Sequence, residues 1–211
     1  NYIAEEVALE GAHRNIPAFS RFLEIAALSN GQIINYTNIA NDAKIPRTTI
    51  HEYFQILRDT LLAYDVTPYK HTIKRKPIMT NKFYFFDCGV ARILQQRNII
   101  NSKSKDFGDA FETYIFHELN SYVDYNSSGK INFWRSTAQH EVDFILNEEI
   151  AIEVKSTSHI SLHDLSGPRA LKEEKLMKKL FIVCLIDVPQ KVDGIQILPW
   201  KMFLDKLWQG L

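Results

Sequence analysis

The residues best suited to chemistry are two acids and a lysine in two apolar runs that follow each other closely. Asp143 lies in the run 141–146 (EVDFIL), and Glu153 and Lys155 lie in 150–155 (IAIEVK). A three-residue hairpin loop pairs residue 146 with residue 150, and therefore Asp143 with Glu153. Because strand side chains alternate, one face should carry the charges and the other the core. The expected charged face holds Glu141, Asp143, Glu153 and Lys155, and the expected core face holds Val142, Phe144, Leu146, Ile150, Ile152 and Val154.

Two carboxylates opposite each other repel, because their Cβ atoms lie roughly 4.5 to 5.5 Å apart. A hard divalent cation such as Mg²⁺ or Mn²⁺ offsets this repulsion, since it prefers carboxylate and carbonyl oxygens and keeps several water molecules. Lys155 is then placed to orient or activate a water molecule and to stabilise charge that develops on a phosphate. The alternative is an ordinary exposed sheet face, on which Glu141 and Lys155 form an ion pair.

Helical and strand patterns alternate around this hairpin. Apolar residues at helical spacing predict a helix over 107–123. A strand is predicted at 131–135, before the hairpin, and another at 180–186, after it. Charged residues with high helix propensity predict a helix over 165–178, and the amphipathic stretch 200–208 predicts a final helix. This order of elements favours the α/β class (α+β overall).

The N-terminal half is predicted to contain helices, a hairpin and a short closing helix. The predicted helices are 16–29, 37–43, 47–62 and 87–94, and the predicted strands are 63–69 and 82–86. The third helix follows a tight turn, as in a helix-turn-helix, and a hairpin with a basic loop directly behind it is what a winged helix requires. The polar stretch 95–105 predicts a linker. We therefore expect a winged helix-turn-helix domain at 1–98 and a second domain at 99–211.

Basic and polar residues of the first domain are candidates for contact with duplex DNA. The start of the third helix would reach base edges or phosphates, and the basic loop would supply phosphate contacts. The candidates are Arg47, Thr48, Thr49, His51, Lys70, His71, Lys74, Arg75 and Lys76. The alternatives are a solvated loop with an ordinary helix start, or a winged helix that packs against a protein partner.

Composition limits the possible classes of protein. The 211 residues carry no net charge, with 25 basic and 25 acidic residues, unlike many dedicated nucleic-acid-binding proteins. The two cysteines indicate neither a disulfide framework nor a cysteine zinc site. No apolar run approaches the roughly 18 residues of a membrane span, and residues 1–10 do not form a secretory signal. We therefore expect a cytoplasmic protein without a membrane partner; a homo-oligomer is left open.

Several sequence blocks resemble a known family. The segments FGDAFETYIFHEL, FWRSTAQHEVDFIL and AIEVKST are similar to the nuclease-like domain that follows the ATPase core in a large group of bacterial and archaeal AAA+ proteins. The segments IPAFSRFLEIAAL, GQIINYTNIANDAKIPRTTIHEYFQIL and KFYFFDCGVARIL are similar to the winged-helix region of that group. The resemblance implies a PD-(D/E)XK, restriction-endonuclease-like domain with a mixed central sheet flanked by helices.

The resemblance also assigns roles to individual residues. It implies that Glu112 is a helix carboxylate, that Asp143 and Glu153 are metal ligands and that Lys155 is the catalytic lysine. The backbone carbonyl of Val154 would be a further ligand. Val142 stands where the name of the motif has proline, which removes no ligand.

The expected function is Mg²⁺- or Mn²⁺-dependent hydrolysis of DNA phosphodiesters. The alternative is a non-catalytic regulatory, DNA-binding or assembly module of an ATPase. The resemblance implies an ATPase core N-terminal to the chain. No G-x-x-x-x-G-K-[ST] motif occurs in the chain itself, so we expect it neither to bind nor to hydrolyse ATP at a P-loop. The start at Asn1, inside a helix-like stretch, likewise suggests a fragment of a longer polypeptide.

Overall fold

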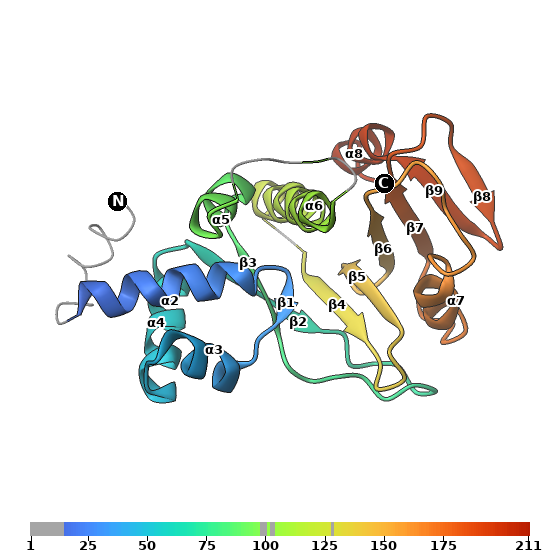
Figure 1. Cartoon of the computed structure of the whole chain (residues 1–211). Coiled ribbons are helices and arrows are strands. Elements are labelled where there is room, and N and C mark those ends of the chain that lie inside the picture. Colours follow the sequence, from blue (N-terminus) through green and yellow to red (C-terminus); the bar gives the residue numbers. More distant parts are fainter. Residues whose placement is uncertain (1–14, 98–100, 102–103, 128) are drawn as a thin grey trace. The chain divides into compact units, whose positions relative to one another are not determined.

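The computed structural model describes residues 15–97, 101, 104–127 and 129–211. The helix-like stretch 1–10 and part of the predicted linker 95–105 lie outside these residues. The chain divides into two compact units. Unit 1 comprises Asn1–Asp65 with Asn81–Ile99, and unit 2 comprises Val66–Thr80 with Ile100–Leu211. The described residues contain seven helices and nine strands (Figure 1), which confirms the mixed α/β class.

Unit 1 contains the predicted helices and strands, with one short strand that the sequence did not indicate. Its elements are α2 (Ile16–Leu28), β1 (Gln32–Ile33), α3 (Tyr36–Ala43), α4 (Arg47–Asp59), the start of β2 (Ala63–Pro68), β3 (Lys82–Phe85) and α5 (Cys88–Leu94). The unpredicted strand is β1, which pairs antiparallel with β3. Helix α4 ends at Asp59, three residues before the predicted end, because Leu61 adopts a left-handed backbone conformation with φ 57°.

Aromatic side chains form the core of unit 1. Phe54 is fully buried and makes edge-on contacts with Phe22 and Phe83, whose ring centroids lie 5.0 and 4.9 Å away. These contacts join α4 to α2 and to β3. Asn15 caps α2 by accepting a hydrogen bond from the Ala18 backbone N–H at 3.0 Å.

Unit 2 contains the predicted hairpin and its neighbours. Its elements are the end of β2, α6 (Lys105–Tyr125), β4 (Ile131–Arg135), β5 (Glu141–Leu146), β6 (Ile150–Lys155), α7 (Ser166–Lys172), β7 (Lys179–Cys184), β8 (Gln190–Val192), β9 (Ile195–Pro199) and α8 (Trp200–Trp208). The bounds of β4, β5, β6 and α8 agree with the predictions. Helix α7 ends at Lys172 rather than at 178, and neither β8 nor β9 was predicted.

The sheet of unit 2 is mixed and is covered on both faces. Its strands follow the order β2-β4-β5-β6-β7-β9-β8; β4, β5 and β6 are antiparallel neighbours, whereas β7 is parallel to β6 and to β9. Helices α6 and α8 pack on one face, through Phe116 against Phe144 and Phe203 against Phe181, and α7 packs on the other (Figure 1). The expectation of a mixed sheet flanked by helices is confirmed.

The segment Val66–Thr80, called the strap below, belongs to unit 2. Its first residues pair in parallel with β4, with Thr67 opposite Asn132. Its later residues return to the other end of β4, where Pro77 bridges to Ser136. The predicted boundary at 98/99 placed the strap in the first domain.

Helix α6 is the longest helix described, and it carries polar side chains along much of its length. Within the described residues, no helix combines the length and apolar character that a membrane crossing demands.

Candidate active site

The β5–β6 hairpin has the predicted register. Leu146 pairs with Ile150, Ile145 with Ala151 and Phe144 with Ile152. Asn147 and Glu148 form the turn with positive φ values of 54° and 61°. Asp143 and Glu153 are the next residues beyond the last of these pairs, at the end of the hairpin away from its turn.

The division into one core face and one charged face is wrong. Ile145 and Ala151 are 0% and 1% exposed, although they share the face that was expected to hold charges. The register between β4 and β5 shifts between Asn132 and Trp134, which inserts one extra residue into β5 at Asp143 and Phe144. Val142 therefore packs in the same cluster as Ile145 and Trp134, while Phe144 faces α6. The acids lie inside a sheet that is covered on both sides.

Asp143 is held against β6 by its carboxylate. The residue is 7% exposed, and its Oδ2 accepts a hydrogen bond from the Val154 backbone N–H at 2.8 Å. In a regular antiparallel ladder, a backbone carbonyl of β5 would accept the hydrogen bond from the Val154 N–H. The carboxylate replaces that carbonyl, and it thereby lies beside the segment that carries Glu153 and Lys155.

Glu153 is a buried acid with one unpaired oxygen. Its Oε1 accepts a hydrogen bond from Lys155 Nζ at 2.5 Å, whereas its Oε2 is buried without a partner among the described residues. Burial, and then the neighbouring charge of Asp143, raise the pKa of Glu153 well above its usual value. Burial disfavours the ammonium form of Lys155, but Glu153 and Asp143 outweigh burial and raise the pKa of Lys155.

Glu112, the fourth predicted site residue, lies on α6 rather than on the hairpin. Within the described parts of the chain, no three His, Cys, Asp or Glu side chains are grouped closely enough to hold a metal ion. Glu112 is half-buried on α6, one turn after Gly108. A Cβ on Gly108 would lie 3.1 Å from Ser156 Oγ. The start of α6 therefore passes the end of β6, and Glu112 is on the same helix face.

Two charged residues near the acids were missed by the sequence analysis. Arg135 ends β4 opposite Glu141; its Nε lies 3.6 Å from Glu141 Oε2, and its terminal nitrogen donates to Gln139 Oε1 at 2.7 Å. Asp164, which accepts from the Ser161 backbone N–H at 2.8 Å, contributes to the raised pKa of Lys155. The only available signals were an arginine at the end of a predicted strand and an acid before a predicted helix.

Helix α7 is held close to the site by a glycine. A Cβ on Gly167 would overlap the backbone oxygen of Glu141, the first residue of β5. Any larger residue would therefore push α7 away from the strand that carries Asp143.

We expect Gly167→Ala to lower the free energy of unfolding by at least about 2 kcal/mol, because a backbone atom cannot move aside as the end of a side chain can. Urea denaturation followed by tryptophan fluorescence measures the change. Gly108→Ala in α6 is the matched control: its new Cβ meets only the Ser156 hydroxyl, and alanine favours a helix. Equal losses in the two variants would contradict the close approach at Gly167.

The candidate DNA-contacting residues of α4 lie on the surface of unit 1. Arg47, Thr48 and His51 are exposed, and Thr49 is half-buried. The His51 ring stacks on Tyr36 with ring centroids 3.9 Å apart. No side chain caps the start of α4, so the first-turn N–H groups do not donate to a capping side chain.

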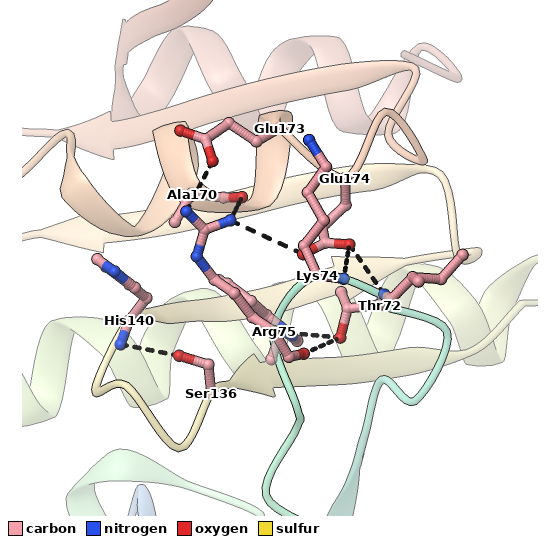
Figure 2. Close-up of polar contacts among 10 residues, drawn as sticks. Thr72, Lys74, Arg75, Ser136, His140, Ala170, Glu173 and Glu174 are labelled. Carbon is pink, nitrogen blue, oxygen red and sulfur yellow. Dashed lines mark hydrogen bonds and ion pairs between the residues drawn. The ribbon is translucent and has the colours of Figure 1, made fainter.

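The basic loop predicted as a wing is the strap, and it packs on α7. Arg75 donates to the Ala170 carbonyl at 3.1 Å and to Glu173 Oε2 at 2.7 Å. The backbone N–H groups of Ile73 and Lys74 both donate to Glu174 Oε2, at 2.9 and 3.0 Å (Figure 2). Lys70, His71, Lys74 and Lys76 remain exposed. The structure therefore differs from the expected free wing, and Arg75 is engaged within unit 2.

Two domain families of unknown function are similar to the chain, each over slightly less than half of its length. Residues 107–203 match a domain of unknown function (DUF4143), which is found at the C-terminus of AAA-ATPase-like proteins, and residues 1–101 match another domain of unknown function (DUF8612). Uncharacterized proteins of Mycobacterium tuberculosis and Mycobacterium bovis are each 20% identical to the chain over 166 residues. That match covers 76% of this chain but 37% of each relative. No solved structure matches the chain.

Proposed function

We propose that unit 2 is a metal-dependent phosphodiesterase of the PD-(D/E)XK class, with Asp143, Glu153 and Lys155 as its catalytic residues. One observation carries this proposal: the Glu153 carboxylate is buried beside Asp143 and keeps one oxygen without a partner among the described residues. Burying such an oxygen costs free energy unless a partner satisfies it. A divalent cation would satisfy it and would relieve the repulsion between the two acids, so the donor set fits Mg²⁺ or Mn²⁺.

Each residue of the proposed site would have a separate role in phosphodiester hydrolysis. Asp143, Glu153 and the Val154 carbonyl would hold the ion, and Glu112 would join them if the start of α6 moved closer to β6. A bound ion supplies Lewis acidity and lowers the pKa of a coordinated water molecule. The Lys155 ammonium would orient the attacking water and stabilise charge on the phosphate oxygens. The new P–O bond forms from water as the bond to the leaving oxygen breaks, and that oxygen takes up a proton.

For unit 1 we propose contact with duplex DNA through a winged helix-turn-helix. Among the described residues, three helices precede the neighbouring strands β2 and β3. The exposed Arg47, Thr48 and His51 and the half-buried Thr49 are suited to contact phosphates and base edges. Of the strap residues, Lys70, Lys74 and Lys76 are exposed for phosphate contacts, whereas Arg75 would have to leave α7. An ATPase core in a longer protein is supported by the similarity of residues 107–203 to a domain found at the C-terminus of AAA-ATPase-like proteins, and by the greater length of the relatives.

The second candidate function is a non-catalytic regulatory or assembly module of an ATPase. Two observations favour it. Lys155 Nζ already contacts Glu153 Oε1 at 2.5 Å, and no three His, Cys, Asp or Glu side chains of the described residues form a group that could hold a metal ion. In that case the acids and the lysine would form a buried structural ion pair.

A cleavage assay separates the two functions. The whole chain is incubated with supercoiled plasmid and with a labelled duplex oligonucleotide, in Mg²⁺, Mn²⁺ or EDTA. We expect cleavage only with a divalent cation, and none by Asp143→Ala. Glu149→Gln is the matched control, because Glu149 lies in the same hairpin but pairs with Lys178 at 2.6 Å. No turnover, together with no calorimetric binding of Mn²⁺, would contradict the nuclease function and favour the second candidate.

A further inference from the structure

A second pocket of unit 2 lies beside the turn of the β5–β6 hairpin and shares no residue with the catalytic cluster. Its volume is about 210 Å³, and it is lined by strap residues 67–71 with Lys130, Asn132 and Glu148. This volume is below the roughly 300 to 1,000 Å³ of sites for drug-sized ligands. The pocket is thus suited to a single ring system.

One wall of the pocket is fixed by backbone contacts. The Asn147 N–H donates to the Lys130 carbonyl at 2.9 Å, and the Lys130 N–H donates to Asn147 Oδ1 at 3.1 Å. Gly129 makes this approach possible: its φ is +123°, and a Cβ there would lie 2.6 Å from Asn147 Oδ1. Lys130 is therefore held next to the turn residue Glu148.

Asn132, which lines the pocket, has an amide oxygen that accepts no hydrogen bond from the described residues. The residue is 2% exposed, and its Nδ2 donates to the Thr67 carbonyl at 3.1 Å and to Thr67 Oγ1 at 2.8 Å. These bonds fix the orientation of the amide, because a flip would set two carbonyl oxygens against each other. Its Oδ1 is buried without a hydrogen-bond partner among the described residues. A ligand N–H at this position would supply the missing donor.

The mouth of the pocket combines cations, an acid and aromatic rings. Lys70 and Lys130 are exposed, and His71 Nε2 lies 3.8 Å from Glu148 Oε2. The Tyr69 and His71 rings meet edge to face at 5.2 Å. Burial, and then Glu148, raise the pKa of Tyr69, so its hydroxyl remains a neutral donor near pH 7.

We infer that this pocket binds the base of one nucleotide, which donates N–H groups to Asn132 and Glu148, while the phosphate of the nucleotide pairs with Lys70 and Lys130 at the mouth. Ammonium groups are common phosphate ligands, and an unstacked base offers its polar edge together with a face for aromatic contact. The nucleotide comes either from an unpaired position of a nucleic acid strand or from the free pool. This inference does not rest on the proposed hydrolysis.

Calorimetric titration of the whole chain tests the inference, with EDTA present to empty any metal site. The probes are adenosine monophosphate, adenosine, inorganic phosphate and a short single-stranded oligonucleotide. We expect the monophosphate to bind more tightly than adenosine or phosphate alone. Competition by the oligonucleotide identifies a strand as the source, and its absence identifies free nucleotide. No binding of the monophosphate, or equal binding of phosphate, would overturn the inference.

Two variants with opposite expected effects on binding affinity complete the test. Lys130→Gln should weaken binding of the monophosphate by about two- to fivefold, the range for one exposed charge pair. Glu148→Gln should strengthen binding of inorganic phosphate. It should therefore reduce the difference between the affinity for phosphate and the affinity for the monophosphate. Lys178→Gln is the matched control, because Lys178 pairs with Glu149 and does not line the pocket. Unchanged affinity in Lys130→Gln would overturn the inference.

Discussion

A chain cut at the predicted domain boundary, residues 99–211, should fail to fold, whereas the same chain with the strap attached should fold. The shorter chain lacks Tyr69, which is 4% exposed in the core of unit 2, and Thr72, whose Oγ1 accepts from the fully buried Trp134 indole N–H at 3.2 Å. Loss of a buried aromatic ring costs about 3 to 5 kcal/mol, and an unpaired buried N–H costs about 1 to 3 kcal/mol. Together they approach the whole stability of a typical domain, about 5 to 15 kcal/mol.

The experiment compares three chains by near-ultraviolet circular dichroism and by urea denaturation. They are the full chain, residues 99–211, and residues 66–80 joined by a flexible glycine-serine linker to residues 100–211. We expect cooperative unfolding in the first and third chains and none in the second. A cooperative transition of residues 99–211 at the urea concentration of the third chain would show that the strap contributes nothing to unit 2.

Two single substitutions separate a structural strap from a DNA-binding wing. Arg75→Ala removes the bonds to Ala170 and Glu173 and should destabilise unit 2, whereas Lys76→Ala changes an exposed side chain and should not. A free wing predicts the opposite pattern, in which both variants keep their stability and both weaken DNA binding. Urea denaturation and a DNA-binding titration of the two variants distinguish these outcomes.

The β5–β6 hairpin could be predicted because its signals are local. Alternating residues in 141–146 and 150–155, and three polar residues between them, determine the pairing of Leu146 with Ile150 without knowledge of the rest of the chain. The inserted residue at Asp143 and Phe144 depends on β4 instead. Sequence periodicity within β5 therefore could not reveal it.

The β8–β9 hairpin was missed although its turn carries a recognisable signal. Asp193 and Gly194 have φ values of 51° and 80°, and they join Val192 to Ile195 in a two-residue loop. An Asp-Gly pair is a strong hairpin signal. Strand β8 is only three residues long and mostly exposed, so it lacks the apolar run by which the other strands were recognised.

The position of the strap in unit 2 could not have been predicted from its own residues. Lys70, Lys74, Arg75 and Lys76 form a basic loop between two strands, which is typical of a wing. The acids that bind it, Glu173 and Glu174, lie about a hundred residues later, within the predicted helix 165–178. Only the tertiary structure shows that an apparently free basic loop is paired within unit 2.

As pH rises, the stability of unit 2 in EDTA and the additional stabilisation that Mn²⁺ provides should change in opposite directions. Because the pKa of Glu153 is raised in the folded chain, folding favours its protonated form. In EDTA the contribution of Glu153 to stability is therefore fully present below its pKa in the unfolded chain. It is lost as pH rises through its pKa in the folded chain. Metal binding requires the ionised carboxylate. The stabilisation by Mn²⁺ should thus grow over the same rise in pH, reaching about 2.7 kcal/mol when free Mn²⁺ is a hundredfold above its dissociation constant.

The measurement is the difference in melting temperature between Mn²⁺ and EDTA, recorded from below the ordinary pKa of a glutamate to pH 8. Taking the difference cancels the groups that titrate alike in both conditions, so the remaining pH dependence reports on the metal site. Asp143→Asn removes one ligand and one repelling charge together, and it should abolish the difference and shift the titration of Glu153 toward ordinary values. Glu149→Gln should leave the difference unchanged, because its partner Lys178 lies outside the site. A difference that is zero at every pH would show that the buried acids hold only Lys155, and that this cluster stabilises the sheet without a metal ion.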